Sequence, residues 1–171
     1  MKPMDDLQVQ TAVATFATEN IVHDKGLFIL APSGSGKTYF VKNQAEKHWI
    51  DGDQLWNAAG AHPEGPWWTE SLEIINEVDR RSDVVTRAAK AKGLWILGAS
   101  NFDLPPDAIV IPPEATLREY IHIRETTDYD GGATSDRFDQ VLGHITWMKD
   151  TYEKMGVPIF SSVAEAVRAL V

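Results

Sequence analysis

Residues 27–38 read LFILAPSGSGKT, and this stretch decides how the chain folds. Its first four residues are all apolar, which is typical of a central strand in a parallel sheet. Glycines follow at positions 34 and 36, and the pattern then predicts a helix from Lys37 to about Lys47. A buried strand, a glycine turn and a helix in direct succession indicate an α/β domain with a parallel sheet.

The rest of the chain alternates in the same way. Further strands are expected at about 48–51, 94–97, 107–111 and 158–160, and helices at 5–18, 69–92, 114–124, 136–155 and 163–170. Thr69 is the expected cap of the longest helix, and residues 54–69 are expected to be irregular. The pattern predicts a three-layer α/β fold with about five parallel strands, helices on both faces and a small lid. We expect one domain over residues 1–171, with a helical extension at 1–25.

Composition narrows the functional classes. The chain has 171 residues, 43% of them hydrophobic, and a net charge of −9, so it is globular and does not coat nucleic acid through bulk positive charge. It contains no cysteine, which excludes disulfides, thiolate zinc sites and cysteine nucleophiles. The start, MKPMDDLQVQ, does not read as a signal peptide, and the apolar runs are too short for a membrane span. We therefore expect a cytoplasmic protein with no membrane partner.

Residues 31–38, APSGSGKT, which we call the glycine loop, match a phosphate-binding pattern with alanine in the first glycine position. Gly34 and Gly36 let the backbone curl so that successive N–H groups point at phosphate oxygens, and the next helix adds its dipole. Lys37 is expected to reach the β and γ phosphates, and the Thr38 hydroxyl to ligate Mg²⁺. The expected cofactors are ATP and Mg²⁺. The residues expected to hold them are Ser33, Gly34, Ser35, Gly36, Lys37 and Thr38.

Two acidic residues follow the second predicted strand, in the sequence Ile50-Asp51-Gly52-Asp53. Carboxyl ends of parallel strands face the ligand crevice, where an acid can accept an acceptor hydroxyl's proton or help to hold Mg²⁺. We take Asp51 as the base because it directly follows the strand, and Asp53 as the magnesium-binding or orienting residue. The alternative is an Asp-Gly turn that merely ends a strand.

A candidate lid spans residues 124–136 around a Gly-Gly pair. An arginine in a mobile lid neutralises charge on a phosphoryl group during transfer and excludes water. Arg124 ends a predicted helix where such a lid would begin, so it is the candidate catalytic arginine. The neighbouring acidic residues fit a solvated surface loop equally well.

The segment 54–69 leaves the end of the second strand and is expected to cover the acceptor. Tryptophan rings stack on nucleobases, which makes Trp56 and Trp67 candidate substrate residues, although packing onto the domain is the alternative. The long helix is basic, and its Arg80 and Arg81 are candidates for a substrate phosphate or a nucleic-acid backbone. The five histidines show no metal-ligand spacing, and His62 is the one that merits a test.

These features resemble the small phosphate-loop kinases, a superfamily that includes nucleoside monophosphate, shikimate, gluconate, adenylylsulfate and polynucleotide 5′-hydroxyl kinases. The specific match covers the glycine loop and, more weakly, the Asp51-Gly52-Asp53 turn, while the element order covers 26–171. The resemblance implies roles in phosphate and magnesium binding for Lys37 and Thr38. It further implies an acceptor-side acid at position 51 or 53 and a lid arginine at 124.

Two departures from that pattern are visible. The third predicted strand runs into Gly98-Ala99-Ser100-Asn101 without the acid that many of these kinases place there for magnesium. The lid also lacks their closely spaced arginine series.

The best-supported function is an ATP-dependent kinase that phosphorylates a hydroxyl of a nucleobase-containing acceptor. That acceptor is a nucleoside, a polynucleotide end or a hydroxymethylated base in DNA, as in bacteriophages with modified pyrimidines. A hydroxyl needs a base, which the Asp51 turn offers, whereas a phosphate needs arginines. A nucleoside monophosphate kinase is one alternative. An ATPase or ATP-dependent interaction module without a small acceptor is the other.

Overall fold

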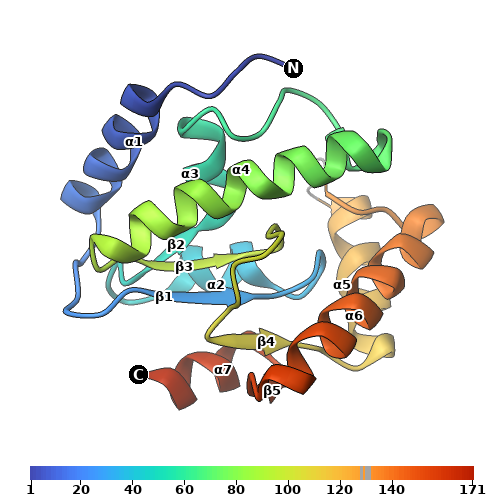
Figure 1. The fold of residues 1–171 in the computed structure, drawn as a ribbon. Helices are drawn as coiled ribbons and strands as arrows, with labels where there is room; N and C mark the ends of the chain where they lie inside the picture. The colour runs from blue at the N-terminus through green and yellow to red at the C-terminus, as the bar shows by residue number, and fades with distance from the viewer. Residues whose placement is uncertain (128, 130–131) are drawn as a thin grey trace. The chain divides into compact units, whose positions relative to one another are not determined.

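A computed structural model describes residues 1–127, 129 and 132–171 (Figure 1). The helices are α1 (Asp6–Glu19), α2 (Lys37–Asn43), α3 (Gly52–Ala58), α4 (Leu72–Ala91), α5 (Glu114–Thr127), α6 (Phe138–Tyr152) and α7 (Val163–Leu170). The strands are β1 (Leu27–Leu30), β2 (Trp49–Asp51), β3 (Trp95–Gly98), β4 (Ala108–Val110) and β5 (Ile159–Phe160). Short 3-10 turns are η1 (Trp67–Thr69), η2 (Ser135–Arg137) and η3 (Glu153–Met155).

The strands form one parallel sheet in the order β2-β3-β1-β4-β5. Ile50 pairs with Ile96 between β2 and β3, and Ile109 pairs with Ile159 between β4 and β5. All four residues of β1 are buried, as a continuous apolar run in a parallel sheet requires. The predicted α/β class with about five parallel strands is confirmed.

The chain divides into two compact units. The first comprises residues 1–28 and 41–104. In it α1 packs against α3 and α4 (Figure 1). Helices α3 and α4 both contact β3, which pairs with β2. Val78, Val85 and Ala89 form the buried stripe of α4, with the spacing of an amphipathic helix.

The second unit comprises residues 29–40 and 105–171. Its helix α7 packs on β4 and β5. Helices α5 and α6 share a small hydrophobic core made of Leu117, Ile121, Phe138 and Val141. Both helices also contact η2, which lies between them in the sequence. The glycine loop belongs to this unit, together with α5 and α6.

Two predicted segments differ from the structure. Residues 52–58, part of which was expected to be irregular, form α3, because the Asp51 side chain caps that helix by accepting the Asp53 N–H. Helix α2 ends at Asn43 rather than near Lys47. The Gln44 side-chain amide both donates to the Trp49 carbonyl and accepts its N–H, which holds the chain in the approach to β2.

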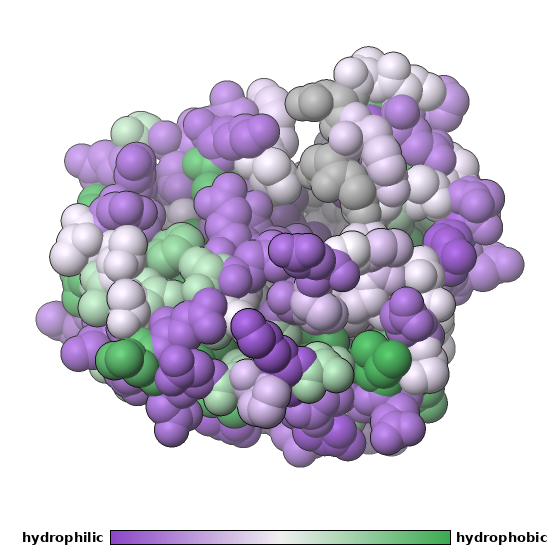
Figure 2. Space-filling view, turned by 90° about the horizontal axis from the view of Figure 1, so that it is seen from above, coloured by the Kyte–Doolittle hydropathy of each residue, from purple (hydrophilic) through white to green (hydrophobic). Residues whose placement is uncertain are grey.

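The face of the molecule in Figure 2 is dominated by hydrophilic residues, with hydrophobic residues scattered in small groups. Such scattering is ordinary for a globular surface and marks no docking site. Among the described residues, no helix combines the length and the apolar character that crossing a membrane requires.

Candidate functional site

Two residues of the glycine loop have a left-handed backbone. Gly34 has a φ of +83° and Gly36 a φ of +90°, both in the left-handed region that favours glycine. Space is also restricted, because a Cβ added at Gly34 would lie 2.5 Å from Cγ1 of Ile121 on α5. The Ser35 N–H donates to the Pro32 carbonyl at 3.2 Å and closes the turn. The loop is therefore a tight turn that only glycine fits at its first left-handed position.

Lys37 opens α2 and folds back over the loop, where its Nζ donates to the Pro32 carbonyl at 2.7 Å. The Ser35 hydroxyl is buried, and it has no hydrogen-bond partner among the residues that the structure describes. A buried polar atom without a partner is uncommon and calls for an explanation. A bound oxyanion that accepts from the hydroxyl would supply the missing partner.

Arg124 of α5 reaches the glycine loop. Its Nη2 lies 2.6 Å from the Ala133 carbonyl and 3.4 Å from Ser33 Oγ. Ser33 Oγ also accepts the Ala133 N–H at 3.2 Å. Ser33 and Arg124, both expected at the site from the sequence, thus connect the segment after α5 to the glycine loop by hydrogen bonds. Residues 128, 130 and 131 of the candidate lid lie outside the described residues.

His144 on α6 was not among the residues selected from the sequence. Burial, together with the Lys37 charge, lowers the pKa of this half-buried histidine to about 4. Near neutral pH it is therefore an uncharged group beside the Lys37 ammonium. A single histidine on a helix, far from the loop in sequence, carries no local signal that would have marked it.

The acidic turn lies in the first unit. Asp51 is buried, and its Oδ1 accepts the Asp53 N–H at 3.0 Å as the N-cap of α3. Asp53 lies in the first turn of that helix and is exposed. Asp51 therefore performs a local structural task that its position after a strand did not reveal.

Trp56 is a core residue, contrary to its selection as a base-stacking side chain. Its ring is fully buried and packs against Gly52 and Gly98, and its indole N–H donates to Thr86 Oγ1 at 3.0 Å. No ring face remains for a substrate base. Trp67 is half-buried instead, and its ring meets those of His62 and Trp68 edge-on.

The two arginines of α4 differ from each other. The Arg81 side chain is only 11% exposed, and its guanidinium binds Glu77 and the Lys2 carbonyl. Its donors hold the N-terminal segment, so this guanidinium, selected as a substrate contact, is already engaged within the first unit. The Arg80 side chain is 51% exposed and covers the Phe102 ring at 4.4 Å while it pairs with Glu77.

His62, the one histidine that merited a test, joins a buried polar chain. Its Nε2 lies 2.9 Å from Ser82 Oγ, and Ser82 Oγ lies 2.9 Å from Ser100 Oγ. Ser100 Oγ lies 2.6 Å from Asp79 Oδ1. Burial raises the pKa of Asp79 to about 7, with the Ser100 hydrogen bond opposing the shift and Asp83 adding to it. Burial lowers the pKa of His62 to about 4, while Asp53 acts in the opposite direction.

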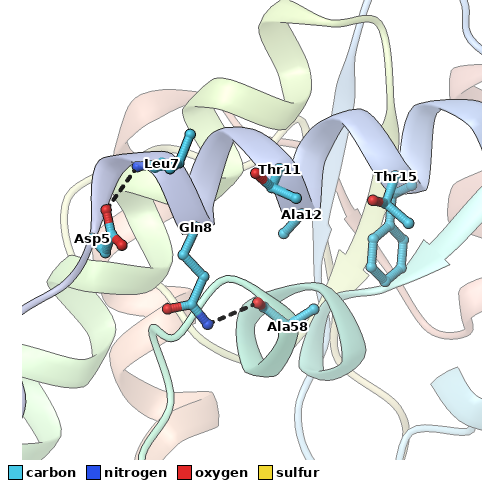
Figure 3. A pocket seen from close by; sticks show the side chains of 8 residues that line it. Asp5, Leu7, Gln8, Thr11, Ala12, Thr15 and Ala58 are labelled. Carbon is cyan, nitrogen blue, oxygen red and sulfur yellow. Dashed lines mark hydrogen bonds between the residues drawn. The ribbon is translucent and has the colours of Figure 1, made fainter.

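An open groove of about 400 Å³ lies along α1 (Figure 3). It is lined by one face of that helix and by Ala58, whose carbonyl accepts from the Gln8 side chain. Its one carboxylate, Asp5, is already engaged with the Leu7 N–H. The groove therefore lacks the convergent charged groups of a catalytic or phosphate-binding site.

Groups of three or more His, Cys, Asp or Glu side chains able to hold a metal ion do not occur in the described part of the chain. Thr38 is half-buried, and its hydroxyl makes no hydrogen bond with the described residues. Comparisons with protein-family models, with curated proteins and with solved structures found no match for this chain. Its function is therefore argued from the chemistry of these residues.

Proposed function

We propose that the chain is an ATP-dependent kinase of the small phosphate-loop type, with the three-layer fold of that superfamily. The observation that carries the proposal is the glycine loop, with two left-handed glycines, Lys37 folded over it and a buried Ser35 hydroxyl that lacks a partner among the described residues. A backbone that curls at two glycines and an ammonium folded over it suit the phosphates of a nucleotide. Arg124, next to Ser33, suits the charge that develops on a phosphoryl group in transfer.

The loop residues fit a nucleotide that carries Mg²⁺. The Thr38 hydroxyl is available as a ligand. When bound, the ion neutralises phosphate charge. Lys37 gives up its contact with the Pro32 carbonyl to a phosphate oxygen, and neutral His144 beside it leaves that ammonium charge undiminished.

The proposed acceptor is a hydroxyl of a nucleobase-containing molecule: a nucleoside, a polynucleotide end or a hydroxymethylated base in DNA. Support comes from the first unit, where Trp67 is half-buried and retains ring surface for a base. Arg80 is exposed enough to reach a phosphate of such a molecule.

A pair of variants on one helix tests the nucleotide site. Lys37→Ala should lower phosphotransfer by about 10²–10³, because one electrostatic donor to the transition state is lost. Lys42→Ala, which removes an exposed lysine of the same helix, should leave it unchanged. Binding of ATP and Mg²⁺ is measured by calorimetry and transfer with γ-labelled ATP. Full turnover in Lys37→Ala contradicts the proposal.

The acceptor class is read from a panel incubated with the same labelled ATP. It contains a nucleoside, a nucleoside monophosphate, a 5′-hydroxyl oligonucleotide and an oligonucleotide with hydroxymethylated pyrimidines. Label on a hydroxyl supports the proposal. Label on the monophosphate replaces it with a nucleotide kinase, and release of free phosphate without an acceptor indicates an ATPase.

A further inference from the structure

Two histidines of the first unit meet where β2 and β3 begin, and we call them the histidine pair: His23 and His48. Nε2 of His23 lies 3.3 Å from Nδ1 of His48, although the two residues are 25 positions apart in the sequence. His23 lies between α1 and β1, and His48 directly precedes β2. Both residues are half-buried, so the pair remains within reach of solvent.

Contacts with the surrounding chain hold the histidine pair in place. The His23 N–H donates to the Gly93 carbonyl at 2.8 Å, and the Ile21 N–H donates to the Lys47 carbonyl at 2.9 Å. Gly93 has a φ of +83°, and a Cβ at this position would overlap the His23 carbonyl, so only glycine permits the approach. The His23 ring also stacks on the Trp95 ring, with the centroids 3.4 Å apart and the planes inclined by 4°. The fold therefore fixes the position of the pair before any ligand binds.

Hydrogen bonds determine which ring nitrogens of the pair can bind an ion. His48 Nε2 lies 3.0 Å from Glu46 Oε2, and a carboxylate only accepts, so we assign the proton of neutral His48 to Nε2. Nδ1 of His48 then carries a lone pair and accepts the Nε2–H of His23. His23 Nδ1 makes no hydrogen bond with the residues that the structure describes, so it can carry the ring proton instead. Both facing nitrogens can thus offer lone pairs while each ring stays neutral.

The separation of the two facing nitrogens suits one metal ion. A tetrahedral Zn²⁺ ion binds histidine nitrogens at about 2.0–2.1 Å, which places two such nitrogens about 3.3–3.4 Å apart. A right angle at the metal, as in square-planar or octahedral coordination, brings them to about 2.8–3.0 Å. The observed 3.3 Å matches the tetrahedral value. The distance therefore favours Zn²⁺ over Cu²⁺ and Ni²⁺, whose preferred geometries are square-planar or tetragonal.

We propose that His23 and His48 bind one Zn²⁺ ion, with Glu46 as the carboxylate that orients His48. On binding, the Nε2 proton of His23 leaves to water and a proton from water binds Nδ1, so the ion replaces the hydrogen bond between the two rings. No third histidine, cysteine or carboxylate ligand joins the pair among the described residues, and water completes the tetrahedron. A carboxylate that accepts from the other nitrogen of a metal-binding histidine fixes the ring and makes it a better ligand.

The zinc site goes beyond the proposed kinase function and shares no residue with the glycine loop. A bound ion joins the segment before β1 to the segment before β2, and it stabilises the folded chain by mass action. The Mg²⁺ that accompanies a nucleotide does not compete for the site, because Mg²⁺ prefers oxygen ligands. Binding of zinc and binding of a nucleotide can therefore be measured separately.

Calorimetry of the metal-free full chain with zinc chloride alone tests the site. One ion should bind per chain, and magnesium chloride should not compete with it. His23→Phe keeps a ring on Trp95 without a ligand nitrogen, and His48→Gln removes the other ligand, so each should abolish this binding. His122→Gln, at an exposed histidine of α5, should leave it unchanged. Circular dichroism checks folding, and His48→Gln decides if His23→Phe does not fold. No zinc binding to the wild type, or unchanged affinity in a folded variant of the pair, overturns the proposal.

The orienting carboxylate and the ring protons supply a second measurement. Glu46→Gln should weaken zinc binding by about 10–100-fold, whereas Glu73→Gln on the exposed face of α4 should not change it. In ¹⁵N NMR, zinc should move the His23 ring from Nε2–H to Nδ1–H and leave His48 as Nε2–H. A His23 ring that keeps its Nε2 proton in the zinc-loaded protein overturns the proposal. These measurements need neither ATP nor an acceptor, so their failure leaves the kinase proposal standing, and failure of the kinase proposal leaves the zinc site.

Discussion

The indole of Trp56 fills a slot whose walls are two glycines. A Cβ added at Gly52 would lie 2.7 Å from its Cη2, and one added at Gly98 would lie closer still. Gly98→Ala should therefore lower the free energy of unfolding by about 1–3 kcal/mol, as overpacking of a close-packed core does. The measurement is urea unfolding followed by tryptophan fluorescence.

Gly143→Ala is the matched control. A Cβ there meets nothing within 4 Å, and the residue lies inside α6. Replacing a glycine inside a helix with alanine should raise the free energy of unfolding by about 0.5–1 kcal/mol. Opposite signs for the two glycine variants are the expected result. Equal small effects would show that the Trp56 slot yields without strain.

The start of α4 is set by Ser71. Its Oγ accepts the Ile74 N–H at 3.4 Å, whereas the Thr69 hydroxyl, the cap expected from the sequence, donates to the Pro66 carbonyl. Ser71→Ala should cost about 0.5–1 kcal/mol of stability, the low end for an N-cap because the bond is long. Ser71→Asp should restore it, since aspartate caps equally well. A larger loss in Thr69→Ala than in Ser71→Ala, measured by urea unfolding, contradicts this assignment.

Stability of the whole molecule should fall as the pH is lowered from 6.5 to 4.5. Burial lowers the pKa of both His144 and His62 to about 4, with Lys37 assisting at the first and Asp53 opposing at the second. The pKa of each histidine returns to 6.5 in the unfolded chain, so between these two pH values both histidines bind a proton when the protein unfolds. This proton uptake favours the unfolded state as the pH falls. Burial raises the pKa of Asp79 from 3.8 to about 7, so this carboxyl loses a proton on unfolding and opposes them.

A net uptake of about one proton on unfolding predicts that the free energy of unfolding falls by about 1.4 kcal/mol for each pH unit between pH 6.5 and 4.5. The burial of His23, aided by His48, lowers its pKa and acts in the same direction. Urea titrations at pH 4.5, 5.5 and 6.5 measure the slope, and His144→Asn should bring it close to zero. Stability that increases toward acid pH would mean that Asp79 outweighs the histidines.

The sequence alone was sufficient to predict features that depend only on consecutive residues. Strand β1 and helix α7 have the predicted bounds, because an apolar run of four and an amphipathic turn pattern are local properties. The left-handed backbone at Gly34 and Gly36 was likewise implied, since glycine is the residue that adopts it without strain. The hydrogen bond between Arg124 and Ser33 was not predicted, because the two residues lie far apart in the sequence.

Tertiary structure alone decided which side chains are buried and which meet. Trp56 belongs to the core because Gly98, more than forty residues away in the sequence, leaves room for its ring. The hydropathy of a segment does not reveal which other segment packs against it. The contacts that join His62, Ser82, Ser100 and Asp79 need three parts of the sequence to come within hydrogen-bond distance, so no spacing rule marks them. Solvent exclusion at these places shifts the pKa of Asp79 and His62, and burial is a property of the packed molecule rather than of any residue type.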